Sequence, residues 1–269
     1  MRKLVVGSMA LAAVLAGPAA AADLARVPVV VEPVFSWSGL YLGLSGGRRW
    51  SHVTWTTMTV TAAPGVQPDL TTTPADFSNS AGRFGGYIGY NWQFAPSWLW
   101  GLEGDFAWGY SSKFAGGVPG TFGTSGLYAP PAAVSFDSSW VKERWDASIR
   151  VRLGFIVTPA FLIYASGGVA LQSIEVGASC SGTGASWCMD GIPRYEPITY
   201  VRTGWTIAAG LEAAVWRNIL ARVEYRYTDY GNIDYTFFTV PPTGDDVQTR
   251  VSLKSQTVLG GIAYKFDTF

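Results

Sequence analysis

The most constraining feature of this sequence is a period-two alternation of apolar with polar or small residues, repeated along most of the chain. In the segment "WSGLYLGLSGG", Leu40, Leu42 and Leu44 fall on one face, and the residues between them fall on the other. Successive side chains of a β-strand point to opposite faces, so such a run predicts a strand whose two faces meet different surroundings. The chain is therefore expected to be all-β.

The alternation recurs in seven further runs, and turn-forming residues divide these runs into hairpins. Three connections are only about three residues long: 95–97, 158–160 and 216–218. Four others are long and polar: near 48–81, 111–140, 177–199 and 229–250. Short turns on the periplasmic side and long loops on the extracellular side are typical of outer-membrane barrels. The sequence therefore predicts an eight-stranded antiparallel up-and-down transmembrane β-barrel with four long extracellular loops.

The size of such a barrel decides which face of each strand points outward. Eight strands enclose an interior just wide enough for side chains, and the aromatic and branched residues would overfill it. A soluble barrel would place this apolar face inside, so we expect the reverse orientation, with the apolar face in lipid. The charged residues then face the lumen, where we expect them to pair: Arg83, Glu103, Asp105, Arg144, Asp146, Arg150, Arg152, Arg202, Glu212, Arg222, Glu224 and Arg226.

Tryptophans gather at the two ends of the predicted strands. They lie near the short turns (Trp92, Trp98, Trp100, Trp216) and near the long loops (Trp50, Trp108, Trp140). Such positions are typical of the aromatic girdles at the two membrane interfaces. Residues 153–174 carry no charge and are long enough for a transmembrane helix, but Pro159 and the glycines within this segment favour a hairpin of two strands.

The first 22 residues have the pattern of a secretory signal peptide. Arg2 and Lys3 precede an uncharged stretch that ends in the small residues Ala20-Ala21-Ala22. We expect a signal peptide at 1–22, a periplasmic linker at 23–36 and the barrel at 37–269. Removal of the signal peptide leaves 17 basic and 19 acidic residues, and this balance gives no indication of nucleic acid as a partner.

The chain contains two cysteines, Cys180 and Cys188, within a Gly/Ser-rich segment. Export places them where disulfides persist, so we expect a loop disulfide between them. A metal site is not expected, because two sulfurs without further Cys or a nearby His do not complete a tetrahedral site.

Several segments, in this order, resemble the small outer-membrane β-barrel family of alphaproteobacteria, which includes surface antigens and haemin-binding surface proteins. The resemblance rests on "AAADL", "FSWSGLYLGLSGG", "WLWGLEGDF", "LIYASGGVAL", "LEAAVWRNILARVEYRYTDYG" and "LGGIAYKF". It implies insertion by the barrel-assembly machinery, which reads an aromatic-ended last strand. Tyr264 with either Phe266 or Phe269 would supply that signal, and the alternation favours Phe266.

Catalytic motifs are weak in this sequence. Gly43–Gly47 matches G-x-S-x-G, yet its Ser45 lies in a predicted strand rather than at a strand-to-helix turn. The only histidine, His52, is expected at the outer rim without a fixed acidic partner. No cofactor site is predicted.

These observations predict a non-catalytic integral protein of the cell outer membrane in a Gram-negative bacterium, with a structural and surface-interaction role. Its expected partners are outer-membrane lipid, lipopolysaccharide and, during biogenesis, the assembly machinery. A narrow porin-like channel is the alternative that the charged lumen suggests. A haem-binding or enzymatic surface barrel that uses His52 is a third.

Overall fold

The computed structural model describes residues 35–61, 73–121, 137–182, 192–239 and 246–266, which are mostly in β-strands. The strands are β1 (Gly39–Thr61), β2 (Ala75–Asp76), β3 (Asn79–Ala95), β4 (Trp98–Gly116), β5 (Ser138–Thr158), β6 (Phe161–Cys180), β7 (Arg194–Trp216), β8 (Ile219–Phe237) and β9 (Asp246–Lys265). The predicted signal peptide and most of the predicted linker lie outside the described residues. Across the described part of the chain, no helix has the length and hydropathy needed to cross a membrane.

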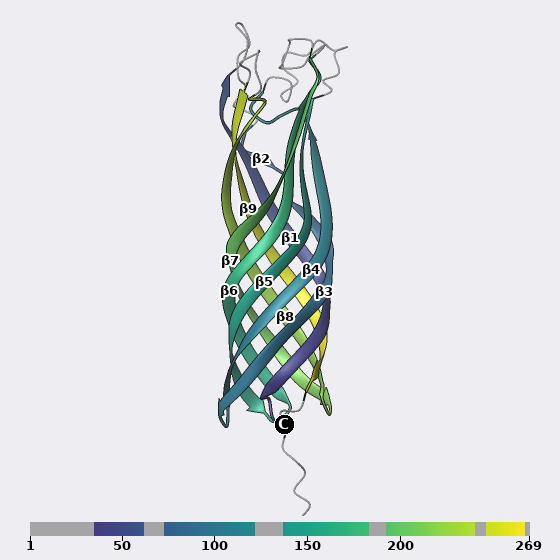
Figure 1. The fold of residues 1–269 in the computed structure, drawn as a ribbon, viewed down its shortest axis with the longest axis vertical. Helices are drawn as coiled ribbons and strands as arrows, with labels where there is room; N and C mark the ends of the chain where they lie inside the picture. The colour runs from purple at the N-terminus through teal and green to yellow at the C-terminus, as the bar shows by residue number, and fades with distance from the viewer. Residues whose placement is uncertain (1–34, 62–72, 122–136, 183–191, 240–245, 267–269) are drawn as a thin grey trace, which may run out of the picture. The chain divides into compact units, whose positions relative to one another are not determined.

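Eight of these strands form a closed antiparallel ring, wound obliquely around a common axis (Figure 1). Neighbours along the chain pair in order, and β1 pairs with β9 from Tyr41↔Lys265 to Thr61↔Asp246. β2 adds two residues beside β1. A closed ring satisfies its backbone hydrogen bonds without leaving an edge in the hydrocarbon. The predicted eight-stranded barrel is confirmed.

The three short connections are turns of two residues at one end of the barrel: 96–97, 159–160 and 217–218. Arg217 in the last of them has a φ of 43°, a conformation that two-residue hairpin turns favour. The hairpin across Pro159 confirms that the uncharged segment 153–174 forms two strands rather than a helix.

The strands extend much further into the four long connections than the sequence predicted. β1, for example, continues through Thr61, although a loop was expected from about residue 48. The polarity of the two faces is inverted in this extension. The inward residues Val53 and Trp55 are apolar and buried, whereas the outward residues His52 and Thr54 are polar and exposed. The prediction followed the outward apolar band and therefore ended each strand where that band ends.

We divide the barrel at this inversion. The membrane half comprises 39–51, 79–95, 98–108, 143–158, 161–172, 205–216, 219–229 and 254–265. The loop half comprises the strand residues beyond it: 52–61, 75–76, 109–116, 138–142, 173–180, 194–204, 230–237 and 246–253. In the membrane half the large apolar side chains point outward and remain exposed, as predicted: Leu44 and Phe84 each keep 61% of their surface.

The loop half opens from a cylinder into two facing sheets (Figure 1). Pairing between β3 and β4 ends at Phe84↔Trp108, and pairing between β7 and β8 ends at Trp205↔Asp229. Beyond these points β4–β7 continue as one sheet and β8, β9 and β1 as the other. Bulges at this junction in the β4–β5, β5–β6 and β8–β9 pairs bend the strands where the wall divides.

The two sheets of the loop half enclose an apolar core of their own. Trp55 stacks on Phe237 with ring centroids 5.4 Å apart and contacts Phe77 at 5.6 Å. The same cluster includes Val141, Ile174, Val176, Val247, Val251 and Leu253. The open edges of the sheets carry Lys113 on β4 and Pro197 on β7, residue types that discourage pairing with a foreign strand.

Candidate functional site

The interior of the membrane half holds a continuous network of ion pairs. Six arginines and six carboxylates take part, and all are buried: Arg49, Arg83, Arg150, Arg152, Arg222, Arg226, Glu103, Asp105, Glu143, Asp146, Glu212 and Glu224. Burying a charge is costly unless a partner compensates it. Equal numbers of the two signs make this network neutral.

Glu103 on β4 lies at the centre of the network. Its Oε1 accepts from Arg150 at 2.6 Å, and its Oε2 accepts from Arg222 at 2.5 Å. The Tyr41 hydroxyl donates to the same Oε2 at 2.9 Å. Arg150 also donates to Glu224 at 2.8 Å, which links β4, β5 and β8 across the lumen. The centre of the barrel is therefore cross-linked by charge-assisted hydrogen bonds.

The network continues toward the loop half through Asp146 on β5. Arg83 Nη2 lies 2.5 Å from Asp105 and 2.6 Å from Asp146. Arg49 then forms ion pairs with two carboxylates, Asp146 at 2.7 Å and Glu143 at 3.0 Å. Each carboxylate in this part has an arginine within salt-bridge distance. None of them is therefore left unpaired to bind a permeating cation.

Aromatic rings and inward glycines complete the packing around the arginines. The Arg222 guanidinium lies 3.5 Å from the ring centroid of Tyr87, and Arg152 lies 4.1 Å from that of Tyr164. A Cβ added to Gly43 would lie 2.4 Å from the Tyr87 ring. The inward glycine therefore makes room for a lumen side chain, as the sequence predicted.

Apolar clusters lie at both ends of the charged network. At the turn end, Leu99, Leu162 and Leu220 are the first inward residues after the three short turns and pack with Trp37. At the other end stands the core of the loop half. A void of about 10 Å³ beside Arg226 is about the space of one water molecule. Between these two apolar clusters the described lumen is occupied by the ion-pair network.

Ten of the twelve charged residues predicted to face the lumen lie in this network, and two do not. Arg144 points outward, with 52% of its side chain exposed, and pairs with Glu175 at 2.7 Å. The cause is the bulge in β5, where Arg144 and Trp145 together oppose Ser173 of β6. Strict alternation across residues 143–146 therefore gave the wrong face, and Glu143 occupies the inward position instead.

Arg202 is the second correction. It lies in the loop half at the seam between β7 and β8, where its Nη2 donates to the carbonyl oxygen of Asn232 at 2.6 Å. Arg49 was missed because it lies in a segment predicted as loop. Continuing the alternation from Tyr41 through Ser45 would have placed Arg49 on the inward face.

Other predicted positions fall at the rims. Trp140 is only 2% exposed because Tyr195 stacks on it at 4.9 Å, so its assignment to a lipid-facing girdle was wrong. Tyr264 and Phe266 are both outward, and the Phe266 amide still donates to Leu40 at 2.8 Å. Phe269 lies outside the described residues, and the role of these aromatics in assembly stays a prediction.

Cys180 is disulfide-bonded, as the predicted disulfide requires. Cys180 ends β6 and packs in the apolar core of the loop half, whereas Cys188 lies outside the described residues.

The two weak catalytic candidates lie apart. Ser45 is 4% exposed within β1, and His52 lies on the outward face near the junction of the halves. Among the described residues, no group of three or more His, Cys, Asp or Glu side chains could hold a metal ion.

An apolar outer wall around a closed, charge-filled lumen defines an integral outer-membrane β-barrel. Residues 9–266 match the family described as "Outer membrane protein beta-barrel domain", and the chain belongs to this family.

Known proteins share this architecture. The chain is 30% identical to the 25 kDa outer-membrane immunogenic protein of Brucella canis over 89% of this chain and 84% of that protein. It is 29% identical to the 22 kDa outer membrane protein of Rhizobium leguminosarum bv. viciae, over 87% and 89%. The crystal structure of OprG from Pseudomonas aeruginosa, at 12% identity, covers 86% of this chain and 97% of its own with a TM-score of 0.50. The expected resemblance and location in the outer membrane are confirmed.

Proposed function

We propose that this outer-membrane barrel acts through its outward surfaces, as a structural and contact protein of the cell envelope. The observation that carries the proposal is the occupied lumen, in which a neutral ion-pair network lies between two apolar clusters. The loop half supports it, because two packed sheets hold the loops beyond the membrane. The relatives that are called immunogenic outer-membrane proteins are consistent with an exposed surface of this kind.

The narrow porin is the alternative, and planar-bilayer recording distinguishes the two. Refolded protein is expected to give no ion-dependent conductance steps, because every lumen carboxylate already has an arginine partner. Reproducible steps that change with the permeant ion would contradict the proposal. A variant that truncates Leu99, Leu162 and Leu220 to Ala tests whether the apolar end is the seal, because conductance should then rise.

We infer further that the protein is not catalytic. The support is positional, since Ser45 is held inside the barrel wall and His52 faces outward, away from Ser45. For the haem-binding alternative, His52→Ala in the purified full chain provides the test. Haem titration should give the same weak signal for both proteins, and loss of a saturable signal in the variant would restore the alternative.

We propose that the assembly machinery reads Phe266 at the end of β9. The support is that Phe266 continues the outward face of Tyr264, with ring centroids 5.0 Å apart. Phe266→Ala is expected to reduce the amount of heat-modifiable protein in outer membranes more than Phe269→Ala does. The opposite order would assign the signal to Phe269.

A further inference from the structure

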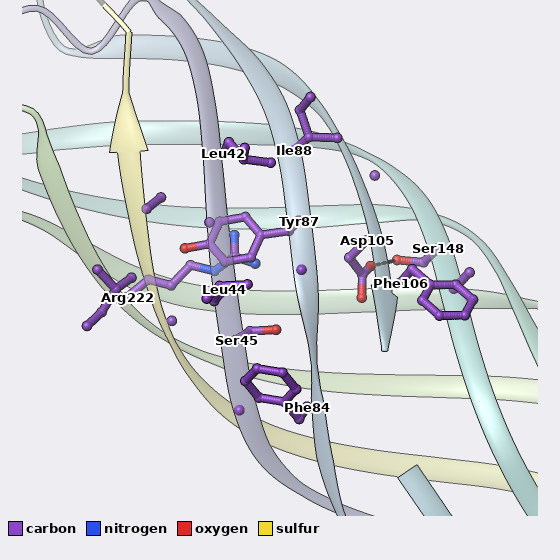
Figure 2. Close-up of a pocket in the computed structure, with 18 of the residues that line it drawn as sticks. Leu42, Leu44, Ser45, Phe84, Tyr87, Ile88, Asp105, Phe106, Ser148 and Arg222 are labelled. Atoms are coloured by element: carbon purple, nitrogen blue, oxygen red, sulfur yellow. Dashed lines mark hydrogen bonds between the residues drawn. The ribbon is translucent and has the colours of Figure 1, made fainter. Parts of the chain in front are cut away.

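An apolar depression of about 1,410 Å³, here called the groove, follows the wall of the membrane half across β8, β9, β1, β3, β4, β5 and β6, and inward residues such as Tyr87 and Arg222 lie at its base. Its outward lining is formed by large exposed side chains, among them Leu42, Leu44, Phe84, Ile88 and Phe106 (Figure 2). Its position on the lipid side of the barrel points to a long, apolar occupant.

The floor of this groove consists of outward glycines. Gly46 on β1 pairs with Gly260 on β9, and Gly86 on β3 pairs with Leu44, the outward residue that precedes Gly46 on β1. A Cβ added to Gly46 would meet no heavy atom closer than 3.8 Å, and one added to Gly260 none closer than 3.9 Å. The lumen glycines differ, because a Cβ on Gly43 would collide with Tyr87. Packing therefore does not require glycine at the outward positions, and their bare backbone keeps the groove deep.

A positively charged side chain, that of Arg48, lies where the groove approaches the loop half. Arg48 lies two residues beyond Gly46 on the same outward face of β1, its Nη2 donates to Ser80 Oγ at 2.8 Å, and its guanidinium is 6.0 Å from the Trp50 ring. Among the described residues, no carboxylate lies within salt-bridge distance of Arg48. The outward cation Lys254, by contrast, lies 3.7 Å from Asp229. Arg48 thus presents a guanidinium that no acid of the described chain neutralises.

We propose that this groove and Arg48 bind a phosphorylated lipid of the outer leaflet. An acyl chain would lie along the glycine floor between Leu44 and Phe84. The phosphate would contact Arg48 and Ser80 at the membrane interface, because a guanidinium binds phosphate with paired, charge-assisted hydrogen bonds. The inference deepens the proposed envelope role by naming a lipid partner and its site, and it does not depend on what the loops contact.

The test uses the purified full chain in detergent and two probes: lipid A with its phosphates, and the same lipid A after their removal. Native mass spectrometry measures the lipid-bound fraction over a lipid titration. Arg48→Gln is expected to weaken binding of the phosphorylated probe about tenfold, the loss of one charge-assisted contact. Gly46→Ile should weaken it about fivefold by filling the groove, the contribution of one or two methylene groups.

Two matched variants serve as controls. Arg250→Gln removes an outward cation that Asp234 already neutralises at 2.6 Å. Gly167→Ile fills an outward glycine of β6 that lies outside the groove, where a Cβ would be 3.6 Å from its nearest neighbour. Both should bind the phosphorylated probe as the unaltered chain does.

Heat-modifiability on gels verifies that every variant is folded. Binding within twofold of the unaltered chain for both Arg48→Gln and Gly46→Ile would overturn the proposal. Equal binding of the two probes would also overturn it. Neither outcome touches the occupied lumen, which bilayer recording tests independently.

Discussion

The two halves of this barrel are built from the same eight strands and have opposite interiors. In the membrane half the outer wall is apolar and the interior is charged, as Leu44 and Glu103 illustrate. In the loop half the interior is apolar, as Trp55 illustrates, and the outer wall carries polar residues such as Thr54 together with some exposed rings such as Phe114. Each half places most of its apolar side chains away from water, and only the location of the water differs. The comparison shows that one strand can continue from lipid into water when the polarity of its two faces is exchanged at the boundary.

The largest expected effect is in the interior of the membrane half. Glu103→Gln removes the central carboxylate and leaves Arg150 and Arg222 short of a buried partner. The unfolding free energy in lipid vesicles should fall by about 5 kcal/mol, the upper end for breaking a buried ion-pair network. Urea titration followed by tryptophan fluorescence measures it. A loss below about 1 kcal/mol would mean that water reaches this centre and that the two interiors differ less than described.

The interior of the loop half should respond through cavity formation instead. Trp55→Ala leaves a void against Phe237 and Phe77, which should cost about 4 kcal/mol. Because the loop half has its own core, we expect the damage to stay local. Limited proteolysis should cut the loop half of the variant while its membrane half keeps its heat-modifiable mobility. Loss of that mobility as well would show that the two halves unfold as one unit.

The outer walls can be compared with one substitution made twice. Leu44→Arg places a charge in the lipid-facing wall and should lower the unfolding free energy by about 3 kcal/mol. Thr54→Arg places the same charge ten residues further along β1, in the loop half, and should change it by less than about 0.5 kcal/mol. Equal losses at both positions would place the boundary between the solvents beyond Thr54.

A smaller effect than that of Leu44→Arg is expected for the outward ion cluster of the loop half, with Glu175 at its centre. A hydrogen bond from Lys142, 2.8 Å away, lowers the pKa of the Glu175 carboxyl below its ordinary value of 4.5. A carboxyl whose pKa is lowered in the folded state stabilises the fold at pH values above its ordinary pKa. This contribution is lost as the pH falls through the lowered pKa. Glu175→Gln should therefore cost about 1 kcal/mol at pH 7 and progressively less as the pH falls below the ordinary pKa. A loss that persists at low pH would assign the effect to packing.

Much of the membrane half could be predicted from the sequence, because lipid imposes a simple rule on its outer face. The outward positions of Leu42 and Phe84 and the inward positions of Arg150 and Glu224 follow from alternation alone. Arg144 could not be placed in this way, since a bulge shifts its face and a bulge leaves no signal in an alternation pattern. The core around Trp55 was missed because Thr-rich neighbours give that segment the composition of a loop.

The ion-pair partners needed three-dimensional information as well. Alternation indicates that Arg83 and Asp146 both face the lumen, but their contact joins strands that are not neighbours in the sheet. Such contacts depend on the diameter and stagger of the closed ring.

The extension of β1 beyond the membrane has a consequence for the reach of the protein. Residues 52–61 span ten positions, and a strand advances about 3.3 Å per residue, so roughly 30 Å of strand, measured along its own oblique direction, lies beyond the lipid boundary. The far end of the described part of β1 therefore stands off from the lipid boundary. Because the inverted alternation resists sliding into the hydrocarbon, this stand-off distance is fixed by the amino-acid sequence itself.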